Sequence, residues 1–310
     1  MVKNLVLENI SVGFKLPQGV FYAVDDVSLS LPGGNFTAII GESGCGKSVL
    51  GQAILNILPS GVIKKGRVLY NGEQVEKILS AFGIIPQNPS ESLNPVRKIG
   101  KQMQDILAVH NIVDSDNSYK KQCLRLFGLE EAERVLAAYP HELSGGMLQR
   151  VLCAMAVSSK PEWILADEPT KGLDEQVGAI VRKNLLTIKQ DLHLSMLIIT
   201  HDIALAQEVC DDVLVMYAGQ VLEHNADIWH KPLHPYTKGF LKALPKNGLQ
   251  VIPGKAPVPG ESFTGCKFAA RYPYCTTRCK EEKPAMQQVG NAEVRCFLYA
   301  EGRKYFQKLY

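Results

Sequence analysis

The stretch FTAIIGESGCGKSVL, residues 36–50, decides the fold of this chain. Its first five residues form an apolar run typical of a buried strand, and residues 49–58 have the composition of a buried helix that ends before Pro59. A glycine-rich loop separates the two. A strand, a glycine-rich loop and a helix in this order indicate an α/β fold.

The loop itself fits the pattern G-x-x-x-x-G-K-[ST], which binds phosphate groups when a strand precedes it and a helix follows. Glycines let backbone N–H groups turn toward a phosphate, and the helix N-terminus adds its positive dipole end. Lys47 can reach the β- and γ-phosphates, and the Ser48 hydroxyl can bind Mg²⁺. The alternative interpretation is an ordinary glycine-rich turn with an exposed lysine.

A second apolar segment, WILA at residues 163–166, runs into Asp167 and Glu168. Two carboxylates at the end of a buried strand are costly unless they leave the core or bind a cation. We expect Asp167 to help hold Mg²⁺ and Glu168 to orient or deprotonate an attacking water. The alternative is an acidic turn that caps a helix before Pro169.

A third motif, LSGGMLQR at residues 143–150, precedes an apolar helical run. Ser144 is a candidate N-cap, and the two glycines after it leave helix N–H groups open to an anion. Taken alone, the motif is more typical of a capped helix after a flexible turn.

The rest of the chain alternates between strand and helix patterns, with one exception. No strand is predicted between residues 88 and 143, which indicates a helical insertion with helices over 96–110 and 120–136. Elsewhere the patterns predict parallel strands with crossover helices and one hairpin. The predicted strands cover 5–12, 27–31, 163–166, 196–200, 213–217 and 220–223, and further helices cover 151–157, 176–190 and 237–244.

Composition excludes several classes of protein. The 310 residues are 46% apolar and 21% charged, which is an ordinary globular mixture. The net charge of +3 offers no electrostatic reason to expect nucleic acid as a partner. No apolar run approaches the roughly 20 residues of a spanning helix, and the N-terminus lacks the apolar core of a signal peptide. We therefore expect a cytoplasmic chain.

In this order, the motifs resemble those of the ATP-binding cassette subunits of ABC transporters, over about residues 1–225. The resemblance identifies residues 41–48 as Walker A and residues 143–149 as the signature. It also identifies Gln87 as the Q-loop residue, Glu168 as the Walker B carboxylate, Asp174 as the D-loop aspartate and His201 as the switch histidine. It implies an ABC-type P-loop NTPase core with an antiparallel β subdomain and a helical insertion, followed by a small irregular extension that contains cysteines.

The resemblance also implies roles. Two cassettes would stack head to tail, each ATP lying between Walker A of one and the signature of the other. Glu168, His201 and Gln87 would be catalytic, and Ser48, Gln87 and Asp167 would bind Mg²⁺. Phe14 would stack on adenine, with Phe21 or Tyr22 as alternatives. The other nucleotide contacts implied are Gly41, Ser43, Gly44, Cys45, Gly46, Lys47, Val49, Ser144, Gly145, Gly146, Gln149 and Asp174.

The D-loop departs from the family pattern. Lys171 and Gly172 precede Leu173-Asp174, where the family often has two small residues. We expect altered dimer contacts there and unchanged chemistry, because Glu168 and Asp174 are both present.

The chain after residue 230 resembles the C-terminal region of the peptide/nickel import subfamily. The segment KPLHPYT, residues 231–237, is similar to the His-Pro-Tyr-Thr motif of that subfamily. Four cysteines follow, and in several members such cysteines bind a [4Fe–4S] cluster. Here Tyr272 stands where the family has a cysteine, so Cys275 would substitute. The resemblance implies a cluster on Cys266, Cys275, Cys279 and Cys296, with Zn²⁺ or unliganded packing cysteines as the alternatives.

The motifs and the two resemblances together predict the domain boundaries and the partners of the chain. Residues 1–230 form the ATPase domain, with a helical subdomain at about 88–143, and residues 231–310 form the extension. The chain hydrolyses ATP at the cytoplasmic face of the membrane, with two permease subunits, a sister ATP-binding subunit and, indirectly, an extracytoplasmic substrate-binding protein.

Cargo and partner identity stay open at the level of sequence. Nickel, free or chelated, is the expected cargo, with dipeptides or oligopeptides as the alternative. A heterodimer of cassettes is favoured over a homodimer. A soluble cassette ATPase that acts on nucleic acid is disfavoured because the chain has one cassette and no coiled coil, and a metal-sensing scaffold is disfavoured because Glu168 and His201 are intact.

Overall fold

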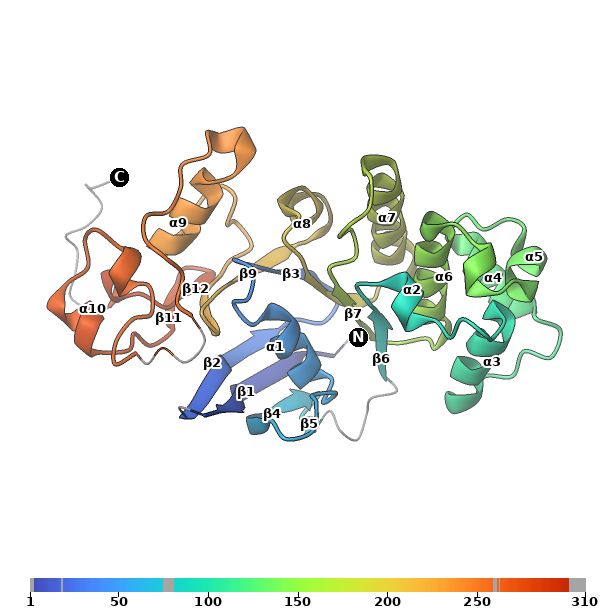
Figure 1. Ribbon diagram of the computed structural model, residues 1–310, viewed down its shortest axis with the longest axis horizontal. Helices are drawn as coiled ribbons and strands as arrows, with labels where there is room; N and C mark the ends of the chain where they lie inside the picture. Colours follow the sequence, from blue (N-terminus) through green and yellow to red (C-terminus); the bar gives the residue numbers. More distant parts are fainter. Residues whose placement is uncertain (1–2, 18, 75–80, 259–260, 262, 301–310) are drawn as a thin grey trace. The chain divides into compact units, whose positions relative to one another are not determined.

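The computed structural model describes residues 3–17, 19–74, 81–258, 261 and 263–300 (Figure 1). The chain packs as two compact units built from interleaved segments. The helical unit comprises Met1–Leu5, Ser30–Phe36 and Leu69–Cys210, and the loop unit comprises Val6–Leu29, Thr37–Val68 and Asp211–Tyr310. The predicted boundary at residue 230 is not tested by this division and stays a prediction.

The helical unit contains three parallel strands in the order β8-β7-β6. Both β7 and β8 are buried along nearly their whole length, as expected for parallel strands covered on both faces. Their register places Ala166 beside Ile85 and Ile198, so the carboxyl ends of all three strands meet at one edge. The strands are β6 (Phe82–Ile85), β7 (Trp163–Asp167) and β8 (Ser195–Ile199).

Most of the unit after these residues is helical, and no strand lies between residues 88 and 143, as predicted. The helix predicted over 120–136 is in fact two helices. Gly128 adopts a left-handed backbone with φ of 70°, which ends the first helix two residues earlier. The helices are α2 (Pro89–Ser92), α3 (Ile99–Val109), α4 (Ser118–Leu126), α5 (Ala132–Ala137), α6 (Gly145–Ser158), α7 (Glu175–Thr187) and α8 (Ile203–Val209).

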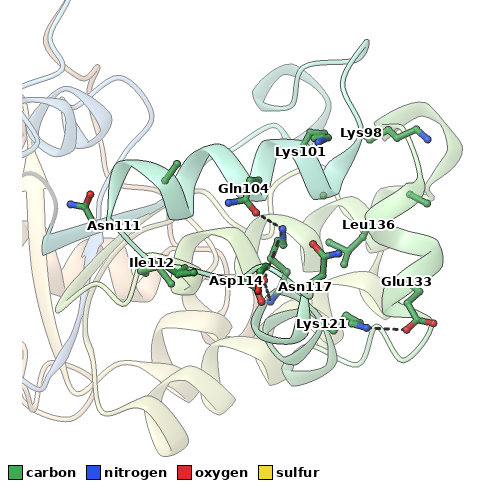
Figure 2. A pocket seen from close by; sticks show the side chains of 16 residues that line it. Lys98, Lys101, Gln104, Asn111, Ile112, Asp114, Asn117, Lys121, Glu133 and Leu136 are labelled. Carbon is green, nitrogen blue, oxygen red and sulfur yellow. Dashed lines mark hydrogen bonds and ion pairs between the residues drawn. The ribbon is translucent and has the colours of Figure 1, made fainter.

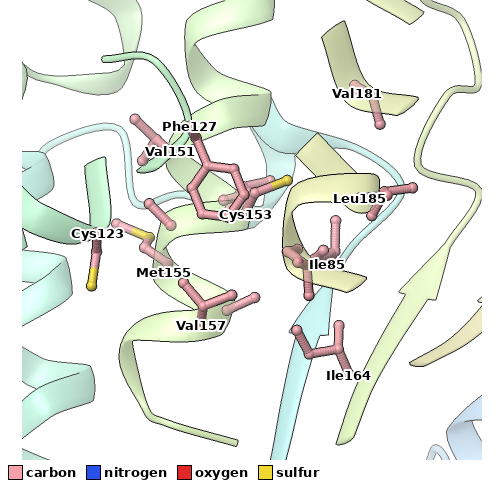
Figure 3. Close-up of a cluster of buried hydrophobic side chains, with 14 of the residues drawn as sticks. Ile85, Cys123, Phe127, Val151, Cys153, Met155, Val157, Ile164, Val181 and Leu185 are labelled. Carbon is pink, nitrogen blue, oxygen red and sulfur yellow. The ribbon is translucent and has the colours of Figure 1, made fainter. Parts of the chain in front are cut away.

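The core of the helical unit forms around α6 (Figure 3). This helix is apolar on nearly every side because α2, α3, α4, α7 and β6 all pack against it. Phe127 and Cys153 are buried on one side of the cluster, and Ile164 and Val181 come from the sheet and from α7. The insertion and the parallel strands therefore share one hydrophobic core.

The loop unit carries the phosphate-loop segment. In it β3 (Phe36–Ile40) pairs in parallel with β9 (Asp212–Tyr217), and β9 forms an antiparallel hairpin with β10 (Gln220–His224). The turn residues Ala218 and Gly219 both have positive φ, which suits the predicted tight hairpin. Helix α1 (Lys47–Ile54) follows β3.

A second sheet has the strand order β2-β1-β4-β5. Strands β1 and β2 extend well beyond the predicted residues, as long ribbons with buried positions concentrated along one face. The pairing of β4 with β5 is antiparallel. The strands are β1 (Leu5–Leu16), β2 (Gly19–Leu31), β4 (Ile63–Tyr70) and β5 (Glu73–Gln74).

The chain after residue 230 continues the β9–β10 layer rather than standing apart from it. Strand β12 pairs with β10, and β11 pairs with β12, both antiparallel. His224 links this layer, since its ring contacts the carboxylates of Asp212 on β9 and Glu293 on β12. The elements are α9 (Pro235–Lys242), α10 (Thr277–Glu281), β11 (Gln287–Val289) and β12 (Ala292–Val294). Sequence patterns did not predict β11 or β12, which are three residues each.

No helix within the described ranges has the length and apolar character needed to cross a bilayer.

The packing of the core predicts which substitutions lower the free energy of unfolding. Val181 is fully buried in the cluster of Figure 3, so Val181→Ala should lower the free energy of unfolding by about 2 kcal/mol through lost apolar burial and the cavity left behind. Urea unfolding followed by circular dichroism measures this. The matched control is Val113→Ala, because Val113 is 90% exposed and its loss should change the free energy by less than about 0.5 kcal/mol. Equal effects at both positions would contradict the assigned core.

Candidate nucleotide site

The phosphate loop is pressed against neighbouring backbone at two glycines. A Cβ on Gly41 would lie 2.1 Å from the carbonyl oxygen of Met216, and a Cβ on Gly46 would lie 2.1 Å from that of Ala23. Both glycines also have positive φ, 148° and 103°. Only glycine fits at these positions, so their spacing in the sequence reflects two backbone contacts.

The helix that follows the loop starts without a side-chain cap. Helix α1 begins at Lys47, its N-cap is Gly46, and no side chain caps its first turn. The buried Lys47 folds back over the loop, and its Nζ donates to the carbonyl oxygens of Gly41 at 2.9 Å and Glu42 at 3.1 Å. An ammonium group beside a helix N-terminus that lacks a side-chain cap is an arrangement suited to an anion.

The remaining loop residues differ in exposure. Ser43 and Gly44 are exposed, Ser48 and Val49 are half-buried, and Cys45 is buried. Burial raises the pKa of the Cys45 thiol, which keeps it protonated and unreactive at neutral pH.

A carboxylate and an imidazole meet in the helical unit. Glu168 Oε2 lies 2.6 Å from Nδ1 of His201, and the backbone N–H of Glu168 donates to Ile199 at 2.8 Å. Glu168 is a non-glycine residue with φ of 50°, a strained conformation of the kind that gathers at functional sites. Its side chain is 11% exposed against 57% for His201, so the pair has a buried carboxylate and an accessible ring.

Asp167 and Gln87 lie at the same edge as this pair. Asp167 is the last residue of β7 and is half-buried, and Gln87 is exposed two residues beyond β6. Because the three strands are parallel, their ends bring Gln87, Asp167, Glu168 and His201 to one edge of the sheet. The sequence-based grouping of these polar residues is consistent with the topology.

The signature residues form a helix N-terminus. Ser144 caps α6, since its Oγ accepts from the N–H of Met147 at 3.3 Å. Gly145 has open space around it and Gly146 faces the Val177 side chain. Gln149 is 1% exposed, and its amide donates to the carbonyl of Pro169 at 3.3 Å. Gln149 therefore supports the turn after Glu168 and does not offer its amide to solvent.

The D-loop is a tight turn that begins α7. Gly172 has φ of 73°, and Asp174 caps the helix by accepting from the N–H of Val177 at 2.9 Å. Lys171 donates its N–H to the Glu168 carbonyl, and its side chain is exposed. The unusual Lys171-Gly172 pair thus closes the turn that follows the carboxylate.

The aromatic candidates for base stacking lie on β1 and β2. Phe14, Phe21 and Tyr22 are all half-buried. Tyr22 already has partners, because its ring packs beside Gly13 and lies under the Lys65 ammonium at 5.4 Å. Phe14 stays the predicted stacking residue.

The predicted iron–sulfur or zinc centre does not fit the arrangement of the cysteines. Among the described residues, which include all four thiols, no group of three or more Cys, His, Asp or Glu is placed to hold a metal ion. Cys266, Cys279 and Cys296 line a cavity of about 30 Å³, and Cys275 does not line it. Burial raises the pKa of Cys266, and that of Cys296 to about 12, so without a bound metal both are protonated at neutral pH.

A larger cavity, of about 950 Å³, opens among α3, α4 and α5, and none of the motif residues lines it (Figure 2). Its buried polar groups bond to one another. Lys120 Nζ donates to Gln104 at 2.6 Å, and the Asp114 carboxylate accepts from two N–H groups at the start of α4. These contacts explain the buried charges as helix capping and packing.

Two contacts to the phosphate loop were missed by sequence reasoning. Tyr236 and Arg271 both bond to Glu42, from 194 and 229 residues away in the chain. The His-Pro-Tyr-Thr motif drew attention to Tyr236, but its pattern predicts only a turn before a helix. No local pattern marks Arg271 as a neighbour of the loop.

Two family models match this chain. The family model described as ABC transporter matches residues 24–171, and the model described as oligopeptide/dipeptide transporter, C-terminal region, matches residues 222–279. The second match covers the His-Pro-Tyr-Thr motif and ends at Cys279.

Curated relatives match almost the whole chain. The oligopeptide transport ATP-binding protein OppD of Haemophilus influenzae is 34% identical, over 96% of this chain and 98% of that protein. The dipeptide transport ATP-binding protein DppD of Escherichia coli is 36% identical, over 93% of this chain and 94% of that protein.

Solved structures match the cassette portion. A dimeric ATP-binding cassette in a post-hydrolysis state with ADP and Pi is 26% identical with a TM-score of 0.61, over 71% of this chain and 97% of that one. The cbiO1 protein of Clostridium perfringens, part of an ABC transporter complex, is 27% identical with a TM-score of 0.60, over 73% of this chain and 89% of that one.

The backbone contacts of the loop predict a specific sensitivity. Gly46→Ala should lower the free energy of unfolding by about 2 kcal/mol or more, because the new Cβ meets the Ala23 carbonyl in a left-handed conformation. Gly145→Ala is the matched control, since Gly145 lies in α6 with open space around it, and its stability should be unchanged or slightly higher. Urea denaturation of the two variants compares them. A stable Gly46→Ala protein would show that the loop is not held by this contact.

Proposed function

Because this chain belongs to the ABC transporter family of ATP-binding cassettes, in the group that carries the oligopeptide/dipeptide transporter C-terminal region, we propose that it is the ATP-hydrolysing subunit of a peptide importer. The observation that carries the proposal is the match to OppD and DppD over more than nine tenths of the chain. Two features of the candidate site also support the proposal. Helix α1 begins at Lys47 without a side-chain cap, and the Glu168 carboxylate contacts the His201 ring.

Peptides replace nickel as the proposed cargo. The sequence-based expectation of nickel is not supported, because the two relatives are named for oligopeptide and dipeptide transport. The expectation relied on short segments that do not touch cargo, so it had no chemical basis for choosing between a metal and a peptide. The alternative of a dipeptide or oligopeptide importer fits better.

ATP and Mg²⁺ are the cofactors of the proposal. The glycine loop, Lys47 and the N-terminus of α1 would hold the phosphates, and Ser48, Gln87 and Asp167 would bind the metal, which neutralises developing charge on the phosphates. Glu168 would accept a proton from the attacking water. The contact with His201 holds one carboxylate oxygen of Glu168 in place, and the other oxygen would orient the water.

Assembly follows from the single copy of each motif. One chain contains one Walker A loop and one signature, so a complete pair of sites requires a second cassette. We propose a sister ATP-binding subunit as that partner, in a heterodimer at the cytoplasmic face of the membrane. Two permease subunits would form the pathway, with an extracytoplasmic substrate-binding protein acting indirectly. Ser144, Gly145, Gly146 and Asp174 would act across the dimer.

Glu168→Gln tests the chemistry. The variant should bind ATP but lose turnover by about 100-fold or more, because an amide cannot accept the proton of water. ATP binding and phosphate release are measured on the purified chain with its partner cassette. Glu133→Gln is the matched control, because Glu133 is exposed and pairs with Lys121 in the helical unit. Normal turnover in Glu168→Gln would remove Glu168 from its proposed role.

Uptake in cells tests the cargo. Cells that lack this subunit should fail to accumulate a radiolabelled dipeptide or pentapeptide, and the wild-type gene should restore uptake of at least one of them. The Glu168→Gln gene should not restore it, which ties uptake to hydrolysis. Restoration of radiolabelled nickel uptake, with no effect on either peptide, would contradict the proposed cargo.

A further inference from the structure

Glu42, inside the phosphate loop, is held by two residues of the chain after residue 230. The Tyr236 hydroxyl on α9 accepts the backbone N–H of Glu42 at 3.2 Å. Nη1 of Arg271 donates to both carboxylate oxygens of Glu42, each at 3.0 Å. One residue therefore fixes the peptide unit and the other fixes the side chain.

Both partners are themselves rigidly placed. Tyr236 is fully buried, and the Arg271 side chain is 7% exposed. The Arg271 guanidinium also donates to the carbonyls of Pro253 at 3.1 Å and Ile252 at 3.4 Å, and it lies 5.6 Å from the Tyr217 ring. With its donors used on backbone acceptors, Arg271 has little freedom to follow Glu42 if the loop moves.

A second connection reaches the same loop from the hairpin turn. The backbone N–H of Gly219 donates to the Cys45 carbonyl at 2.9 Å. Lys267, buried and also beyond residue 230, donates to the neighbouring Ala218 carbonyl and pairs with Asp25, both at 2.8 Å. The C-terminal residues thus contact the loop directly at Glu42 and support it indirectly at Cys45.

These contacts matter for a loop that binds a polyanion. A glycine-rich loop loses much conformational entropy when it orders around phosphate, and a loop already held in place pays less of that cost on binding. Glu42 also places a negative charge in a segment that must accept negative phosphates. The Arg271 guanidinium offsets that charge.

We propose that Arg271 and Tyr236 are positioning residues of the nucleotide site, which hold the phosphate loop in its binding conformation and neutralise Glu42. The inference rests on the proposed ATP-binding function and extends it to the C-terminal segment. Through these two residues, the chain after residue 230 would influence the affinity of the site for ATP. Neither residue touches the reacting atoms, so both act through Glu42.

The test compares ATP affinity in full-length variants. Arg271→Met should raise the Kd for ATP with Mg²⁺ about tenfold, because an uncompensated carboxylate then remains in the loop. Glu42→Gln added to Arg271→Met should restore the Kd to within about threefold of wild type, since it removes that charge. Arg271→Lys should lie between wild type and Arg271→Met.

The matched control is Arg278→Met, in the same segment, because Arg278 pairs with Glu282 at the surface and stacks on the Phe297 ring at 4.2 Å, and neither partner belongs to the phosphate loop. Its Kd should equal that of wild type. Tyr236→Phe is the milder variant, which keeps the packing and removes only the hydroxyl, and it should raise the Kd about threefold. The melting temperature of every variant is recorded beside its Kd.

Three outcomes would overturn the inference. An unchanged Kd in both Arg271→Met and Tyr236→Phe would show that the loop does not depend on these residues. A raised Kd in Arg271→Met that Glu42→Gln fails to restore, with a parallel loss of melting temperature, would assign Arg271 to stability alone. A wild-type chain that binds no ATP would overturn the proposed function together with the inference, which distinguishes that failure from the first two.

Discussion

The close approach of backbone to backbone at Gly41 and Gly46 is the constraint on which the nucleotide loop depends. Carbonyls of Met216 and Ala23 occupy the space that side chains would need. These contacts hold the loop in a curved conformation, in which the Lys47 ammonium donates to the Gly41 carbonyl and α1 begins without a side-chain cap. The proposed phosphate-binding role of the loop therefore depends on how tightly the loop is packed.

The polar residues around Glu168 are placed by the sheet and not by the phosphate loop. Parallel pairing of β6, β7 and β8 aligns the ends of three strands, so polar residues that follow each strand share an edge. Glu168 adds a strained backbone to this arrangement and is kept there by its bonds to Ile199 and His201. The sheet supplies the coarse placement, and the local hydrogen bonds orient the carboxylate.

The C-terminal residues join the cassette instead of forming a separate appendage. Strand β12 extends the β9–β10 layer, and Arg271, Lys267 and Tyr236 reach the loop and its neighbouring hairpin. The four cysteines of this segment are half-buried, and three of them, Cys266, Cys279 and Cys296, line a small cavity. The segment therefore has a physical reason to be retained that does not require a metal.

The sequence by itself determined the parts whose signals are local. The loop pattern around Lys47, the buried strands before Ser43 and Asp167, and the insertion without strands are set by residues adjacent in the chain. Only tertiary structure decided that Arg271 meets Glu42, that Gln149 is buried under Pro169, and that the four cysteines do not form a ligand cage. These outcomes depend on packing between segments up to 229 residues apart, and periodicity and spacing contain no information about such contacts.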